Sequence, residues 1–135
     1  MDITASVERV LNRKEVIADL FYQVFLDRHP EVRKFFVQVD LKQQAVMLTM
    51  ALMIVEHHYT RPYPATEHYL RVLGHRHHEY GIPPDLYPGF RDCLLETLEQ
   101  FHGILWEDSL AAQWRDALDR TTTTMLEGYQ KPYIY

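Results

Sequence analysis

Hydrophobic residues recur every three or four positions along most of this chain, and that spacing places them on one face of an α-helix. The pattern predicts a short helix at residues 7–11 and a longer one that runs from there to about Asp27. Asn12 followed by Glu15 has the spacing of a capping box, which predicts that the longer helix begins there. Its inward face is predicted to hold Val16, Ile17, Leu20, Phe21, Val24 and Phe25.

Prolines and cap residues then predict sharp corners. Pro30 disfavours helical geometry at the residue before it and starts a short helical segment at residues 31–36. Asp40 is a typical helix N-cap, and the helix after it is expected to end near His58. The inward face of that helix is predicted to hold Leu41, Ala45, Leu48, Leu52 and Val55. Two prolines predict that residues 60–64 belong to the longest irregular stretch of the chain.

Three more helical segments follow, and Gly81 is predicted to end the first, because glycine readily adopts a left-handed conformation at helix C-termini. Asp85 and Asp108 are predicted to cap the other two. Their inward positions are Tyr87, Phe90, Leu94, Leu98 and Phe101, then Leu110, Trp114, Leu118, Thr121 and Met125. The aromatic end at residues 129–135 is expected to pack on the body of the protein or on a second subunit. Because no segment alternates with the period of a strand, the sequence predicts an all-α fold.

Composition narrows the classes of function. The 135 residues predict a single domain over residues 1–135, and the net charge of −5 argues against nucleic acid as the main partner. Cys93, the single cysteine, is expected to be a small core residue and suits a reducing compartment. We find no signal-peptide pattern at the start, and the most apolar stretch, residues 45–55, is too short to span a membrane. A cytoplasmic protein is therefore expected.

Residues with metal chemistry gather at residues 70–88, where His75, His77 and His78 stand near the end of a predicted helix. Structural zinc needs four paired ligands, and a di-iron bundle needs two copies of Glu-x-x-His; the sequence offers neither. It also lacks the Cys-x-x-Cys-His motif for covalent haem attachment. Haem held non-covalently by one of the three histidines stays open, as does an exposed or structural role for each.

Three separated segments occur in an order that resembles bacterial single-domain haemoglobins, the three-over-three globins related to the globin domain of flavohaemoglobins. The segments are FYQVFLDRHPEVRKFF at residues 21–36, a glutamine on the next helix, and LGHRHHEYGIPPDLYP at residues 73–88. The likeness extends over about residues 5–129. It implies a globin fold, a three-over-three helical sandwich around a b-type haem, with haem b (iron protoporphyrin IX) as cofactor.

The resemblance also assigns residues to the two faces of the haem. His77 matches the proximal ligand of the iron, so His75 and His78 are expected to point outward. Further proximal and pocket positions are Leu73, Ile82, Tyr87, Phe90 and Leu118. On the distal face, Tyr22 matches a tyrosine that donates a hydrogen bond to the bound gas.

A glutamine is also expected on the distal face, and two neighbours compete for that place. Gln44 is preferred over Gln43 because it keeps a more regular hydrophobic stripe facing inward. Phe36 matches the phenylalanine that wedges the haem, and Leu48 is the apolar neighbour over the iron.

The implied function is reversible binding of dioxygen or other diatomic gases for scavenging, storage or delivery, by a monomer or homodimer. The alternatives are a nitric-oxide dioxygenase or peroxidase-like enzyme with a separate reductase, and a gas sensor that acts through a partner. Flavohaemoglobins carry a glutamate that bonds the proximal histidine, where this chain has Tyr129, and Glu127 is expected to point elsewhere. No flavin or nicotinamide domain is expected. Both points favour gas binding over oxidative catalysis.

Overall fold

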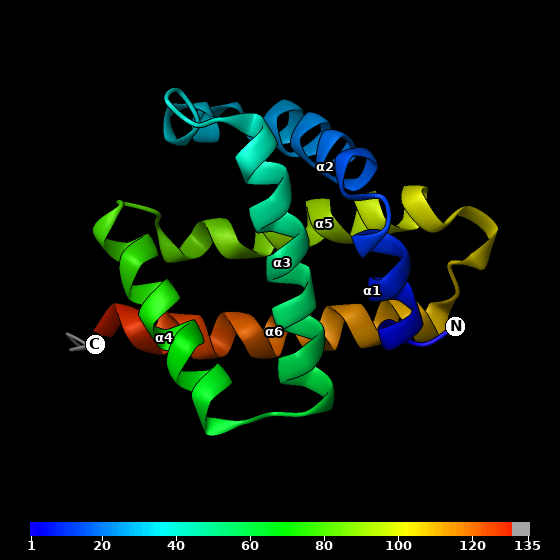
Figure 1. Ribbon diagram of the computed structural model, residues 1–135. Helices are drawn as coiled ribbons and strands as arrows, with labels where there is room; N and C mark the ends of the chain where they lie inside the picture. Colours follow the sequence, from blue (N-terminus) through cyan, green and yellow to red (C-terminus); the bar gives the residue numbers. More distant parts are fainter. Residues whose placement is uncertain (131–135) are drawn as a thin grey trace.

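The computed structural model describes residues 1–130, which form six α-helices and three short 3₁₀ helices and contain no strand (Figure 1). In chain order the elements are α1 (Ile3–Leu11), α2 (Lys14–Arg28), η1 (Pro30–Phe35), α3 (Leu41–Thr60), α4 (Pro64–Glu79), η2 (Pro84–Leu86), α5 (Tyr87–His102), η3 (Gly103–Leu105) and α6 (Asp108–Gln130). The predicted all-α class is confirmed. Tyr129 lies in α6, whereas residues 131–135, the rest of the aromatic end, lie outside the described range.

The junction of α1 and α2 differs from the prediction. Asp2 caps α1, because its carboxylate accepts a hydrogen bond from the Ala5 N–H at 2.9 Å. The Asn12 side chain donates to the Glu8 carbonyl at 3.0 Å and so closes the C-terminus of α1. The predicted capping box is therefore wrong. The Asn12 side-chain amide bonds to a carbonyl that the end of α1 leaves unpaired, and it does not cap α2.

The start of α3 follows the prediction, and the start of α4 does not. The Asp40 carboxylate accepts a hydrogen bond from the Lys42 N–H at 2.9 Å and caps α3. The irregular stretch predicted at residues 60–64 shrinks to residues 61–63, because Pro64 is already the first residue of α4. Proline is suited to that position, since its missing N–H would have had no partner there.

The end of α4 is a Schellman motif, a standard glycine-terminated helix end. Gly81 has a φ of 90°, its N–H donates to the His78 carbonyl at 3.0 Å, and the Ile82 N–H donates to the His77 carbonyl at 3.0 Å. The predicted glycine terminator is thus confirmed. Asp85 was expected to cap α5 but lies inside η2, because the helical turn that Pro84 starts runs directly into α5.

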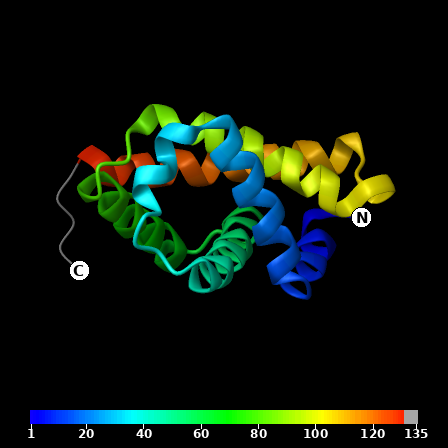
Figure 2. The same ribbon diagram turned by 90° about the horizontal axis from the view of Figure 1, so that it is seen from above.

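The helices stack in two layers, which Figures 1 and 2 show from the front and from above. α3 and α4 lie in front of α5 and α6, and α3 crosses over both of them. α2 packs against α3 and α5, while α1 packs against α3. α6 packs against both α3 and α4.

α4 and α6 meet backbone to backbone at two glycines. A Cβ atom on Gly74 would clash with the carbonyl of Met125, and one on Gly128 would clash with the carbonyl of Arg71. Only glycine lets the two backbones approach so closely, because it has no Cβ atom. The level at which α4 rests on α6 is therefore set by the main chain itself.

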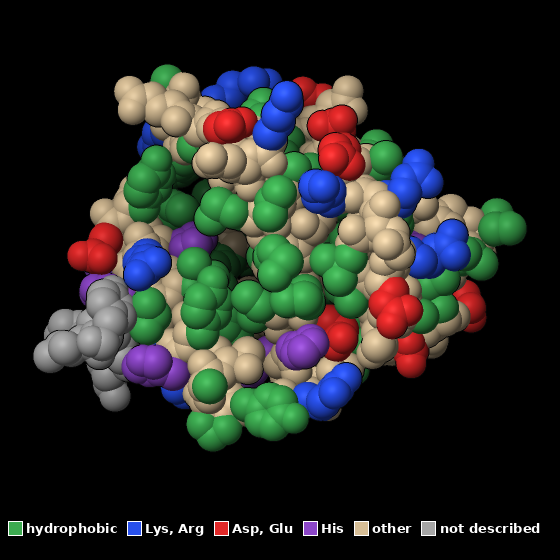
Figure 3. Space-filling model, in the orientation of Figure 1, with side chains coloured by type: hydrophobic (Ala, Val, Ile, Leu, Met, Phe, Trp, Pro, Cys, Tyr) green, Lys and Arg blue, Asp and Glu red, His purple; other side chains and the backbone are tan. Residues whose placement is uncertain are grey.

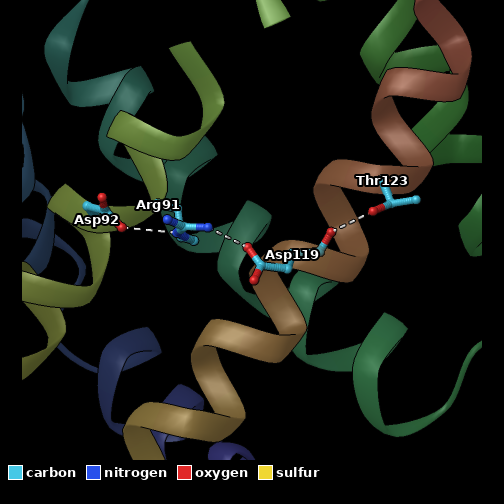
Figure 4. A network of polar contacts seen from close by, with 4 residues as sticks. All are labelled: Arg91, Asp92, Asp119 and Thr123. Atoms are coloured by element: carbon cyan, nitrogen blue, oxygen red, sulfur yellow. Dashed lines mark hydrogen bonds and ion pairs between the residues drawn. The ribbon is translucent and has the colours of Figure 1, made fainter. Parts of the chain in front are cut away.

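A polar tie joins the two rear helices (Figure 4). The Arg91 guanidinium of α5 donates to the carboxylates of Asp119 on α6 and of its neighbour Asp92, each at 3.0 Å. The Thr123 hydroxyl donates to the Asp119 main-chain carbonyl at 3.0 Å. Arg91 thus joins α5 to α6 directly.

The core takes buried side chains from α1, α2, α3, α5 and α6, and most predicted inward positions are buried. Val16 and Leu41 are exceptions, with 38% and 55% of their surface exposed. Both stand in the first turn of a helix. Cys93 is buried, as predicted. Within residues 1–130, no helix combines the length and apolar character needed to cross a membrane.

Candidate functional site

A hollow opens on the face of the molecule that carries α3 and α4 (Figure 3). Hydrophobic side chains make up most of its rim, and a histidine side chain is visible inside it. A hollow of this composition suits a flat apolar group that needs one polar anchor.

His77 on α4 is half-buried and carries its proton on a defined nitrogen. Its Nδ1–H donates to the Leu73 carbonyl, one turn earlier, at 2.8 Å, since a carbonyl can only accept. The other nitrogen, Nε2, therefore keeps its lone pair, which is the form in which imidazole binds a metal. Burial lowers the pKa of His77 below its usual value, and the hydrogen bond to Leu73 opposes this. His77 is thus a neutral imidazole at neutral pH.

Three predicted distal residues come together from separate elements. The ring of Tyr22 on α2 meets the ring of Phe36, which follows η1, edge to face at a centroid distance of 5.5 Å. Burial raises the pKa of Tyr22 to about 12, and a hydrogen bond from Gln44 of α3 opposes this. Tyr22 therefore keeps its hydroxyl proton at neutral pH and can donate it. Gln44 is half-buried, whereas Gln43 is exposed.

Aromatic contacts join the distal residues and His77 to the same helix, α5. Phe21, next to Tyr22, meets Phe90 of α5 at a centroid distance of 5.0 Å. Phe90 lies one turn beyond Tyr87, whose ring is 6.5 Å from that of His77. We call Tyr22, Phe36 and Gln44 the distal side, and Leu73, His77 and Tyr87 the proximal side.

The remaining predicted pocket residues differ in burial. Leu48 of α3 and Leu118 of α6 are buried members of the hydrophobic core. Leu73, Ile82 and Phe90 are half-buried. A half-buried apolar side chain retains surface that a bound apolar group could cover, whereas a fully buried one already packs against protein.

The two other histidines of α4 behave differently from each other. His78 is exposed, in agreement with the prediction. His75 was expected to point outward, but its Nδ1–H donates to the Gly128 carbonyl of α6 at 3.2 Å. This prediction is wrong because α4 lies so close to α6 that the residue after Gly74 also faces the neighbouring helix.

Sequence reasoning missed three residues that hold the proximal side in place. Gly74 and Gly128 let α4 approach α6, and the Tyr129 hydroxyl donates to the Ile82 carbonyl at 2.9 Å. A glycine three residues before His77, inside a helix, was the available signal, since glycine weakens a helix unless a neighbour needs the space. Tyr129 was noted as a departure from the flavohaemoglobin pattern, but its partner Ile82 lies 47 residues earlier in the chain.

Comparison with known proteins decides the family. The sequence model of the globin family matches residues 19–125, which is most of the chain. The chain belongs to the globin family. It is 26% identical over 119 residues to a flavohemoprotein of Bacillus cereus, a match that covers 87% of this chain and 29% of that protein. The chain thus spans less than a third of the length of this curated relative.

Membership of the globin family implies haem binding, and the residues of this globin fit such a group. A porphyrin needs flat apolar walls and one imidazole with a free lone pair. The hollow has an apolar rim, and His77 offers Nε2 because its Nδ1–H is engaged. Tyr22 and Gln44, which the resemblance assigns to the distal face, carry polar hydrogens.

Proposed function

We propose that this globin holds haem b through His77 and reversibly binds dioxygen or another diatomic gas, for scavenging, storage or delivery. The observation that carries the proposal is the state of His77. Its Nδ1–H is given to Leu73 at 2.8 Å and burial keeps the ring neutral, so Nε2 is ready to bind iron. The haem iron, when bound, supplies the coordination position at which a diatomic gas binds.

The distal residues would hold the gas. The Tyr22 hydroxyl keeps its proton at neutral pH, since burial raises its pKa to about 12, and it donates to a gas molecule that carries partial negative charge. Gln44 donates to Tyr22 and so orients that hydroxyl. A hydrogen bond to a charged partner in a buried pocket is worth about 1.5–3 kcal/mol, which slows release of the gas.

Apolar residues would hold the faces of the porphyrin and exclude water. Leu73, Ile82, Phe36 and Phe90 keep exposed apolar surface that the ring could cover, and Leu48 and Leu118 form the deeper wall. Burial of apolar surface contributes about 25 cal/mol per Å². Exclusion of water also strengthens each hydrogen bond on the distal side.

The proximal side favours gas binding over a nitric-oxide dioxygenase or peroxidase-like function. A carboxylate partner would make the proximal imidazole more electron-donating, as an oxidising haem enzyme requires. Here the acceptor of the His77 Nδ1–H is the neutral Leu73 carbonyl. Glu127 instead lies 3.7 Å from the Arg71 guanidinium, measured from Oε2 to Nε.

The wider role follows from the same reasoning. We propose a single globin domain over residues 1–135 that acts in the cytoplasm as a monomer or homodimer, with diatomic gases as ligands. A separate reductase would return oxidised iron to the ferrous state. The flavohemoprotein relative supports this partner, because its name indicates a flavin-containing protein.

Absorption spectra of the purified protein with added haem test the proposal. We expect a Soret band in the ferric and ferrous forms, a shift when dioxygen is admitted, and a return when dioxygen is removed. His77→Ala removes the imidazole and is expected to abolish the native ferrous spectrum, whereas His57→Ala, at an exposed position of α3, leaves it unchanged.

A wild-type protein that shows no Soret band after haem addition would overturn the proposal. Rapid conversion of nitric oxide to nitrate with a supplied reductase would favour the dioxygenase instead. If His77→Ala and wild type have the same spectra, another residue holds the iron.

A further inference from the structure

A chain of hydrogen bonds reaches His77 from the last helix. The Tyr129 hydroxyl donates to the Ile82 carbonyl at 2.9 Å, and the Ile82 N–H donates to the His77 carbonyl at 3.0 Å. The hydroxyl oxygens of Tyr87 and Tyr129 lie 3.0 Å apart. Because Tyr129 gives its proton to Ile82, Tyr87 must be the donor in this pair. The order is therefore Tyr87 to Tyr129 to Ile82 to His77.

The electrostatics agree with this direction. Burial raises the pKa of Tyr87, and the bond to Tyr129 raises it further, as expected for a donor that would lose its bond on ionising. Burial also raises the pKa of Tyr129, but the bond from Tyr87 opposes this, as expected for an acceptor. Both hydroxyls stay neutral at neutral pH, so the chain brings no charge to the proximal side.

The residues that follow Ile82 explain why its carbonyl pairs with a side-chain donor. Ile82 is the last residue of the Schellman motif that ends α4, and Pro83 and Pro84 follow it directly. Proline has no N–H, so the next two residues cannot supply a backbone donor near this carbonyl. The donor comes from α6 instead, and it ties the end of α4 to that helix.

The same turn of α6 also supports the middle of α4. Gly128 receives the backbone of α4 at Arg71, and its neighbour Tyr129 holds the end of α4 through Ile82. His77 lies between these two contacts. The distance of His77 from α6 is thus fixed by two contacts: the main-chain contact at Arg71, before His77 in the chain, and the Tyr129 hydrogen bond at Ile82, after it.

We propose that Tyr129, supported by Tyr87, is the positioning residue of His77. It locks the Schellman motif at the end of α4 and so fixes the height and rotation of the imidazole. The His77 Nδ1–H keeps the Leu73 carbonyl as its acceptor, while Tyr129 acts on the main chain at the end of α4. The part of this inference that concerns iron rests on the proposed function.

Amide hydrogen exchange in the haem-free protein tests the lock. Tyr129→Phe removes the donor to Ile82, and we expect the Ile82 N–H to exchange about five- to tenfold faster, as loss of one hydrogen bond predicts. Tyr87→Phe keeps the bond from Tyr129 to Ile82, so its effect is smaller. Tyr80→Phe is the matched control, because Tyr80 is 62% exposed at the same helix end. The Ile82 N–H of this variant should exchange at the wild-type rate.

Resonance Raman spectra of the ferrous, haem-loaded protein supply a readout that general loss of stability would not move. We expect the iron–histidine stretching band to shift or broaden in Tyr129→Phe, less in Tyr87→Phe, and not in Tyr80→Phe. Equal Ile82 exchange in wild type and Tyr129→Phe would overturn the proposal. If Tyr129→Phe does not fold, Tyr87→Phe decides, since an unchanged Ile82 amide in that variant also overturns it.

The two proposals fail separately. The exchange measurement needs no haem, so a chain that takes up no haem overturns the proposed function without touching the lock on α4. Conversely, normal gas binding with unchanged Ile82 exchange in Tyr129→Phe and Tyr87→Phe overturns the lock alone.

Discussion

The two sides of the candidate haem site are built in opposite ways. On the proximal side, one helix carries His77 and rests with its backbone directly on α6 at Gly74 and Gly128. On the distal side, Tyr22, Phe36 and Gln44 come from α2, the residue after η1, and α3, and they meet through side chains. The nearby turns of α3 also expose apolar side chains: Leu41 at 55%, Met47 at 61% and Met50 at 43%.

This contrast shows how the fold separates two tasks. A residue that binds a metal must be held within a fraction of an ångström, and direct backbone contact with few adjustable side chains achieves this. The side that admits a ligand must open, and segments joined only by side-chain contacts can move apart more readily. Phe35, next to Phe36, and Tyr80 at the end of α4 meet at a ring-centroid distance of 6.0 Å, so the segments that carry the two sides touch there.

The strongest test of the proximal side is Gly128→Ala. Alanine is the better helix former by about 1 kcal/mol, but here its Cβ would clash with the Arg71 carbonyl of α4. We expect the free energy of unfolding to fall by about 3 kcal/mol, as for other overpacked sites, in chemical denaturation. Gly89→Ala is the control, because its Cβ would meet only the His29 ring, at 2.7 Å, and that ring can rotate. Equal losses in both variants would contradict a backbone-set contact.

On the distal side, removal of one hydroxyl should change how fast the ligand is released without changing the fold. Tyr22→Phe is expected to release dioxygen about 10- to 100-fold faster, because a hydrogen bond to a charged partner is lost. Stopped-flow displacement by carbon monoxide measures this rate. Gln44→Leu should have a smaller effect in the same direction, whereas Gln43→Leu, at an exposed position, should have none. An unchanged rate in Tyr22→Phe would exclude the assigned donor.

The smallest expected effect is the response to pH, which also separates the two sides. Burial lowers the pKa of His77, so below about pH 6.5 the unfolded chain takes up a proton that the folded chain resists. The stability of the haem-free protein should therefore fall as the pH decreases through this range. His102 contributes in the same direction, because burial lowers its pKa too.

Denaturant titrations at about pH 7.5 and about pH 5.5 measure this response. His77→Phe should reduce the difference in unfolding free energy between the two conditions. The distal side gives no such response, because the pKa of Tyr22 is raised to about 12. A His77→Phe variant with the full pH dependence would contradict the buried neutral state of His77.

Local signals in the sequence were sufficient for much of the fold. The cap at Asp40, the corner at Pro30 and the terminator at Gly81 act within one helical turn, so their effects can be judged without the rest of the chain. Such signals gave a wrong prediction where one residue could take either of two structural roles. Asn12 could begin α2 or end α1, and the carbonyls already present at the end of α1 decided between them.

The sequence by itself determined the helices, the all-α class and the segments that resemble globins, and it placed a histidine four residues before a helix-ending glycine. Only the tertiary structure decided that His75 faces α6, that Gly74 and Gly128 meet the opposite backbone, and that Tyr129 completes the end of α4. The physical reason is the separation along the chain of the residues that interact. Helix periods and caps depend on neighbours three or four residues away, whereas these contacts join residues about fifty positions apart and exist only after α4 has crossed α6 at one particular height.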